Sequence, residues 1–113
     1  MLNLPEKITI TQENVNQFLA EREAGVGLTH CCPIHQALRP YMAQHSEVEN
    51  FEVGSGWLDV YFGETYYEEP YAYQMLRLDD QARDFILAVD KFNGPSMMQF
   101  PTEITLLKGP DTK

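Results

Sequence analysis

Three consecutive strand-like segments in the middle of the chain place the strongest constraint on its fold. They cover residues 48–53, 57–62 and 71–78, and a Gly-Ser-Gly turn at residues 54–56 separates the first two. A turn this short joins antiparallel neighbours, because parallel strands need a long crossover connection. The three segments therefore predict an antiparallel meander.

The side chains of the second predicted strand alternate between two faces. Leu58, Val60 and Phe62 share one face, and we expect this apolar face to meet the core. The opposite face carries one acidic and two aromatic side chains, Trp57, Asp59 and Tyr61. The sheet is therefore predicted to be covered by helices on one face.

Helical periodicity precedes the meander. A short strand over residues 7–10 leads to Thr11, whose side chain is expected to cap a helix. A second helix begins at Pro33, since a proline in the first helical turn loses no hydrogen bond. Pro40 predicts a kink or an early end in this helix, because its nitrogen cannot donate to Gln36. The helix carries an apolar stripe formed by Ile34, Ala37, Leu38, Tyr41 and Met42.

One more helix and one more strand follow the meander. Asp79 is expected to cap the helix, and residues 103–107 form the last strand. The apolar face of that helix consists of Ala82, Phe85, Ile86 and Val89. The chain is thus predicted to be a single α+β domain over residues 1–113, in the order β-α-α-β-β-β-α-β. Its sheet is mainly antiparallel, and its helices pack on one face.

The net charge of −9 is confined to one part of the chain. Residues 47–90 hold eleven acidic residues and only two basic ones, Arg77 and Arg83, whereas acids and bases balance in the remainder. An acidic surface repels nucleic-acid phosphates, whose binding depends on Lys and Arg. The charge predicts no direct nucleic-acid binding and favours a protein partner with a basic surface. The alternative is that the acids only keep the domain in solution.

The connection over residues 63–70 is both acidic and aromatic, and we expect it to be exposed. Tyrosine gives a large contact area at low entropic cost, so these side chains are candidates for anchoring a partner. The predicted partner-binding residues are Glu64, Tyr66, Tyr67, Glu68, Glu69 and Tyr71. The alternative for the tyrosines is packing between neighbouring strands.

Both cysteines and two of the three histidines lie within residues 30–35, at the predicted start of a helix. A helix start favours the thiolate form of a cysteine placed there. One alternative makes Cys32 a catalytic nucleophile with His30 or His35 as its base, and another makes His30, Cys32 and His35 a metal site. The sequence shows no clear third catalytic group and no second pair of zinc ligands. We therefore expect structural thiols, no metal and no cofactor.

Nothing in the sequence predicts a membrane or a secreted protein. No apolar run approaches the about 20 residues that span a bilayer, and the first residues lack the parts of a secretory signal. Adjacent cysteines bridge each other only under strain, so no disulfide is predicted. Free thiols fit a reducing compartment, and we expect a cytoplasmic protein.

Two patterns together resemble a group of small proteins. The first is a Cys-Pro helix start, Cys32-Pro33-Ile34-x-x-Ala37-Leu38-Arg39. The second is Leu78-Asp79-x-x-Ala82-x-x-Phe85-Ile86-x-x-Val89-Asp90-x-Phe92, with Phe100-Pro101 after it. These patterns resemble uncharacterised small proteins of bacteriophage and actinobacterial genomes, which show a Cys-Pro helix start and a Leu-Pro, Ala, Phe-Ile, Phe-Asp pattern. Asp79 stands where that group usually has proline. The resemblance implies a phage or mobile-element origin and carries no activity with it.

Taken together, the residues favour a non-catalytic accessory protein that binds another protein. One form of this hypothesis is a phage-encoded inhibitor that occupies a basic, nucleic-acid-binding surface of a host or defence protein, because clustered acids imitate the field of phosphates. The alternative is a thiol- or metal-dependent enzyme or redox sensor centred on His30, Cys31, Cys32 and His35. The sequence leaves the oligomeric state open.

Overall fold

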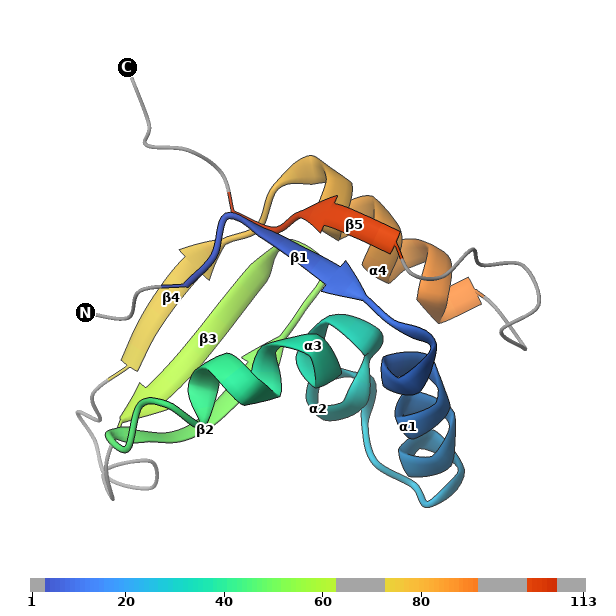
Figure 1. The fold of residues 1–113 in the computed structure, drawn as a ribbon, viewed down its shortest axis with the longest axis horizontal. Helices are drawn as coiled ribbons and strands as arrows, with labels where there is room; N and C mark the ends of the chain where they lie inside the picture. Colours follow the sequence, from blue (N-terminus) through green and yellow to red (C-terminus); the bar gives the residue numbers. More distant parts are fainter. Residues whose placement is uncertain (1–3, 63–72, 92–101, 108–113) are drawn as a thin grey trace.

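The computed structural model of this protein describes residues 4–62, 73–91 and 102–107 (Figure 1). The described elements are β1 (Lys7–Ile10), α1 (Gln12–Glu23), α2 (Leu28–Cys31), α3 (Pro33–Met42), β2 (Val48–Val53), β3 (Trp57–Phe62), β4 (Tyr73–Arg77), α4 (Asp80–Lys91) and β5 (Thr102–Thr105). This order confirms the predicted α+β class. It differs from the predicted order by the short helix α2, which lies between the two helices predicted before the meander.

The described strands form two antiparallel sheets instead of the one sheet expected. β2, β3 and β4 form the predicted meander, and β1 pairs with β5 so that Ile8 lies opposite Ile104. Within the described residues, one bridge between Leu78 and Leu107 joins the two sheets. β1 is separated from the meander by three helices in the chain, and it finds its partner in the last strand.

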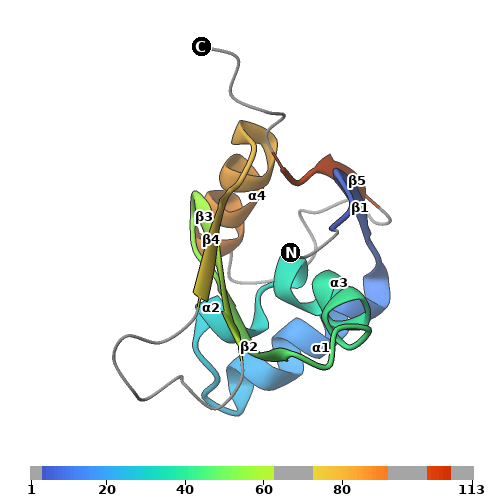
Figure 2. The ribbon, with the colours of Figure 1, turned by 90° about the vertical axis from the view of Figure 1, so that its left-hand side faces the viewer.

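Helices and the β1–β5 pair cover one face of the three-stranded sheet. Figure 2 shows this sheet nearly edge-on, with α1, α3, β1 and β5 all on the same side. On β3, Leu58 and Val60 point to this side and are fully buried, as predicted, while Phe62 is half-buried. In the described part of the chain, no helix is both long and apolar enough to cross a membrane.

The core fills the space between the three-stranded sheet and the elements in front of it. Leu38 of α3 and Leu58 of β3 are both fully buried there, in one cluster. Phe18 of α1 lies instead in a smaller cluster with Cys31 and Val89. The main core thus joins both sheets through α3, and the smaller cluster joins α1, α2 and α4.

The ends of the first and third helices follow local sequence signals. Thr11 Oγ1 accepts the N–H of Asn14 (3.2 Å), and Asn14 Oδ1 accepts the N–H of Thr11 (3.0 Å), which satisfies two donors at the start of α1. Gly25 follows α1 with φ of 95°, a conformation that favours glycine. α3 begins at Pro33 as predicted but continues past Pro40 to Met42, so the expected early end does not occur. The missing N–H removes one hydrogen bond, and the buried side chains of Leu38 and Met42 keep the last turn in place. Tyr41, which was predicted to belong to the same stripe, is exposed.

The turn between β2 and β3 brings a tryptophan over a glycine. The N–H of Gly54 donates to the carbonyl of Trp57 (2.9 Å), and the indole ring occupies the place that a side chain on Gly54 would take. Glycine at this position therefore lets the Trp57 ring lie flat against the end of the sheet.

Candidate functional site

The two cysteines lie at the junction of α2 and α3. α2 ends at Cys31, and Cys32 is the N-cap of α3, where its Sγ accepts a hydrogen bond from the N–H of His35 (3.4 Å). Both side chains are buried, with 0% and 2% of their surface exposed. Burial raises the pKa of the Cys31 thiol, and the Glu21 carboxylate raises it further. Cys31 is therefore a packed, protonated thiol.

Cys32 lines a cavity of about 270 Å³ between α2, the β2–β3 turn and α4. Among the described residues that line this cavity there is no histidine and no carboxylate, and its polar side chains besides the thiol are those of Thr29, Ser55 and Trp57. A cysteine nucleophile needs a base within hydrogen-bond reach of its sulfur. Cys32 lines this cavity and His35 does not, so the cavity does not bring the thiol and the imidazole ring together.

His35 is engaged by structural hydrogen bonds. Its ring stacks on Phe51 with the centroids 3.9 Å apart and the planes 7° apart. Nε2 donates to the carbonyl of Phe51 (3.2 Å), because Nδ1 accepts the Nε–H of Arg39 (3.2 Å) and so cannot carry the proton. Burial, together with the charge of Arg39, lowers the pKa of His35 to about 4. The ring is neutral at pH 7, and both of its nitrogens already have partners.

Arg39 connects α3 to two other helices. Its guanidinium donates two hydrogen bonds to the carboxylate of Glu21 on α1 (2.7 and 2.7 Å) and one to the carbonyl of His30 on α2 (3.0 Å). The bond from Arg39 holds the pKa of Glu21 at about 2. With the bond to His35, these contacts make Arg39 the centre of a half-buried network that fixes α1, α2 and α3 relative to one another.

Replacing Arg39 by methionine is expected to lower the free energy of unfolding by roughly 2 kcal/mol, since Glu21 and His35 Nδ1 lose their donor. The loss is smaller than for a fully buried pair because water reaches part of the guanidinium. Urea unfolding at pH 7 measures it. Glu21→Gln is the matched control and should cost less, because the amide oxygen still accepts from Arg39. An Arg39→Met protein as stable as the parent would contradict the assignment.

The described residues do not form a metal site. No group of three or more His, Cys, Asp or Glu side chains among them lies close enough to hold an ion. The ring of His30 is 6.1 Å from that of His35, and its Nε2 lies 3.5 Å from the carboxylate of Glu52. His30, Cys32 and His35 therefore do not present the converging donors that the metal alternative requires.

The partner-binding residues predicted from the sequence lie outside the described residues. They are Glu64, Tyr66, Tyr67, Glu68, Glu69 and Tyr71, all within residues 63–72. The structure describes the two strands to which this segment is attached. β3 ends at Phe62, β4 begins at Tyr73, and Tyr61 lies opposite Tyr73 in the sheet. The segment therefore begins and ends at the same end of the three-stranded sheet.

The outer face of the three-stranded sheet, which we define as the face turned away from α3, carries two facing carboxylates. Glu52 of β2 lies directly opposite Asp59 of β3. Glu52 accepts a hydrogen bond from the hydroxyl of Tyr61 (2.9 Å), but Asp59 Oδ1 is buried and has no hydrogen-bond partner among the described residues. Burial raises the pKa of Asp59, and the charge of Glu52 raises it further. This pair is the least satisfied charged feature of the sheet.

Register counting from the sequence would have missed this pair. Counting outward from a turn at residues 54–56 places Glu52 opposite Leu58. In the structure Gly54 bonds to Trp57, so the turn is one residue shorter and Glu52 lies opposite Asp59. The bonds of Arg39 also had no signal in the sequence, because Glu21 and Arg39 lie on different helices.

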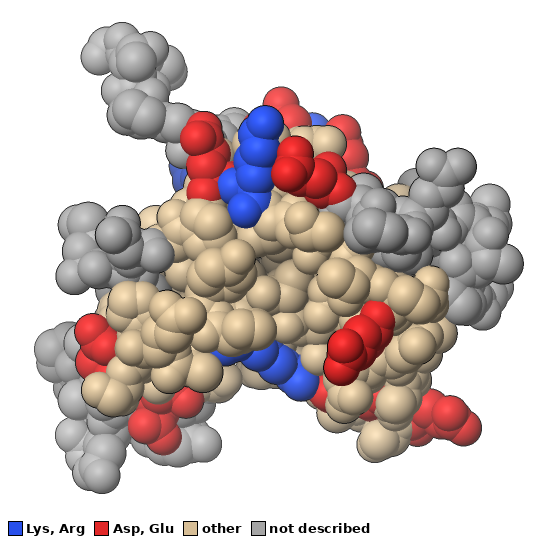
Figure 3. Space-filling model, viewed as in Figure 1, with Lys and Arg blue, Asp and Glu red and all other residues tan. Residues whose placement is uncertain are grey.

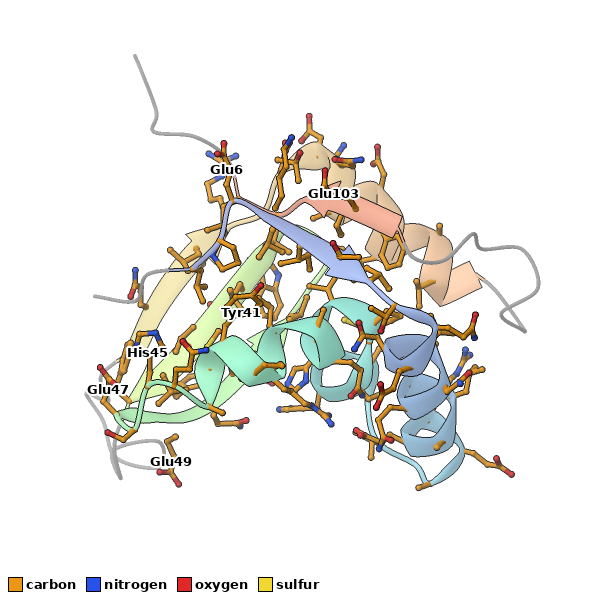
Figure 4. All side chains as sticks on the ribbon, in the orientation of Figure 1. Glu6, Tyr41, His45, Glu47, Glu49 and Glu103 are labelled. Atoms are coloured by element: carbon orange, nitrogen blue, oxygen red, sulfur yellow. The ribbon has the colours of Figure 1, made fainter. Side chains whose placement is uncertain are left out.

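Further acids lie near the start of β2, at one end of the sheet. Figure 4 shows Glu47 and Glu49 there, beside His45, whose Nδ1 lies 3.9 Å from a Glu47 oxygen. Glu49 lines a hollow together with Arg39 and Met42 of α3, so it lies at the edge of the sheet and not on its outer face. On the side of the molecule that carries α3 and β1, most of the surface is uncharged, with a few acidic and basic side chains (Figure 3).

Comparisons with known proteins do not relate the chain to a family. No protein-family model matches it, and neither a curated protein nor a solved structure was found to be similar.

Proposed function

We propose that this chain is a non-catalytic protein that binds a partner through the outer face of the three-stranded sheet. The partner presents a basic surface of the kind that binds nucleic acid, and the chain inhibits that partner by occupying the surface. The observation that carries the proposal is the facing pair Glu52 and Asp59, in which one buried carboxylate oxygen has no partner among the described residues.

A positive group from another protein would offset the repulsion between these two carboxylates. A Lys or Arg side chain placed beside them on the outer face would attract both charges, although the buried Oδ1 of Asp59 lies out of its reach. Trp57 and Tyr61 lie on the same strand and the same face as Asp59, and such aromatic residues are frequent anchors in protein interfaces. The outer face thus combines charge for a basic partner with aromatic contact area.

The distribution of charge supports the choice of partner. The strands β2, β3 and β4 contain three acidic residues and one basic residue, Arg77, and the acidic segment 63–72 is inserted between two of them. A compact acidic surface attracts proteins that bind phosphates, because both depend on the same Lys and Arg side chains. The buried thiols and the engaged ring of His35 give no comparable support to the enzyme alternative.

Removing the two charges without changing shape tests this proposal. Glu52→Gln with Asp59→Asn should abolish or strongly weaken capture of the partner from a native-host lysate. Glu13→Gln with Glu23→Gln is the matched control, since it removes the same charge from the exposed surface of α1. Proteins retained by the parent and the control but lost from the first variant are the partners. Purified partner should release a labelled oligonucleotide when the parent chain is added.

Two results would count against the proposal. If both double variants retained the same proteins, the acids would act only through total charge, and the outer face would not be the contact surface. If the captured partner bound its oligonucleotide equally well with and without the chain, the inhibitory role would be wrong.

A further inference from the structure

The three-stranded sheet has one protected edge and one open edge. β2 and β4 are the two edge strands of this sheet, and β3 lies between them. On β2, the outward-pointing backbone groups of Phe51 are both bonded to side chains. Its carbonyl accepts from His35 Nε2 (3.2 Å), and its N–H donates to Asn50 Oδ1 (2.9 Å). A register shift between Val48 and Asn50 further interrupts this edge. β2 is thus protected against pairing with another strand.

β4 has no such protection among the described residues. In an antiparallel pair, every second residue of a strand bonds to its neighbour. The N–H of Leu78 donates to the carbonyl of Gly56 (3.1 Å), so Leu76 and Gln74 are the residues of β4 that bond to β3. The backbone groups of Met75 and Arg77 therefore point away from β3. No described residue donates to them or accepts from them, and β4 has no register shift. β4 lies at the left-hand edge in Figure 1, the side that faces the viewer in Figure 2.

The exposure of Met75 fits contact with a second strand at this edge. Met75 is 60% exposed, the highest value among the large hydrophobic residues that the structure describes. It lies in the middle of the five-residue strand, with Tyr73 two residues before it and Arg77 two residues after it. An unprotected edge strand with an exposed apolar centre is a template for strand pairing.

We propose that β4 pairs with β4 of a second copy of this chain. In an antiparallel arrangement centred on Met75, Met75 lies opposite Met75 of the second copy, and Arg77 lies opposite Tyr73 of the second copy. The two strands then exchange about six backbone hydrogen bonds. The two sheets join into one, and the outer faces of both copies lie side by side.

Charge favours a second copy over a basic strand from another protein. Arg77 is the only charged residue of β4, and the antiparallel arrangement keeps the two arginines at opposite ends of the seam. A strand rich in Lys or Arg would add positive charge beside Arg77. The interface adjoins the proposed partner surface, because Met75 lies opposite Asp59 on the outer face, but its backbone hydrogen bonds use the edge of β4 and not the carboxylates of Glu52 and Asp59. Two chains of net charge −9 repel each other, so the dimer should be strengthened by salt.

Sedimentation velocity of the purified full chain tests this dimer. We expect a concentration-dependent dimer whose dissociation constant falls when NaCl is raised from about 0.15 M to about 0.5 M. Met75→Pro should weaken it by about tenfold or more, because proline removes an outward N–H that bonds across the seam and leaves the ladder to β3 intact. Met75→Val is the matched control, since it keeps the N–H and a strand-favouring side chain. The control should dimerise like the parent.

A second variant and a second measurement make the test independent of how well the proline variant folds. Met75→Lys places like charges opposite each other across the seam and should also give a monomer. Hydrogen exchange should show protection of the Met75 and Arg77 amides that grows with protein concentration. The proposal is overturned if the parent is monomeric at all concentrations in both salts. It is equally overturned if a dimer persists unchanged in Met75→Pro and Met75→Lys.

Discussion

Leu38→Ala is expected to lower the free energy of unfolding by about 2 to 5 kcal/mol, the usual cost of truncating a fully buried leucine. Leu38 has no exposed surface and lies in the main core beneath α3, where it packs in one cluster with residues of both sheets. A small domain has a total stability of about 5 to 15 kcal/mol, so this one change removes a large part of it. Urea unfolding followed by circular dichroism gives the difference.

Leu87→Ala is the control for this truncation. Leu87 lies on α4 with 41% of its surface exposed, so the same chemical change should alter stability by less than about 0.5 kcal/mol. Equal losses for the two variants would show that the core is not where the structure places it.

Acid is expected to destabilise the protein in two successive pH ranges. The pKa of His35 is about 4 in the folded protein and 6.5 in an unfolded chain, so protons bind preferentially to the unfolded chain between these values. The stability that neutral His35 contributes is complete above pH 6.5 and is lost as pH falls to about 4. This loss is on the order of 3 kcal/mol. Glu21 has a folded pKa of about 2 against 4.5, so its contribution is lost between pH 4.5 and about 2.

Stability curves at several pH values for the parent and for His35→Gln separate these two ranges. Glutamine does not titrate, and its side-chain amide can still donate to the carbonyl of Phe51. The variant should therefore show a flat stability between pH 6.5 and about 4.5 and the same loss at lower pH as the parent. Asp59 acts in the opposite direction, since its raised pKa means that protonation at low pH favours the folded state. A parent whose stability is constant from pH 7 to pH 4.5 would refute the role of His35.

The parts of the fold that could be predicted depend on local chemistry. β2 and β3 have the predicted bounds, because a two-residue alternation ends at glycines on either side of their turn. The starts of α1 and α3 follow from the hydrogen bonds of Thr11 and the missing N–H of Pro33. Each of these signals involves residues within a few positions of one another, which is the range over which a pattern indicates structure.

The features that could not be predicted depend on contacts between distant residues. The pairing of β1 with β5 joins segments at opposite ends of the described chain, and no local pattern indicates it. The same is true of the bonds from Arg39 to Glu21, which decide how three helices meet. For the cysteines the sequence suggests a helix start that favours thiolate, but the structure buries Cys31 and raises its pKa instead. Cys31 lies at the end of α2 and not at a helix start, and its burial depends on the whole fold.

The pairing of β1 with β5 has a consequence for synthesis on the ribosome. Ile8 and Ile104 are neighbours in the folded sheet, and both are buried in the main core. Bringing together residues so far apart in the chain is slow, because a long loop must close before the contact forms. A ribosome adds about 5 to 20 residues per second, so β1 emerges several seconds before its partner. During that interval the apolar side of β1 lacks its partner β5, and a chaperone that shields short apolar segments would find a target in β1.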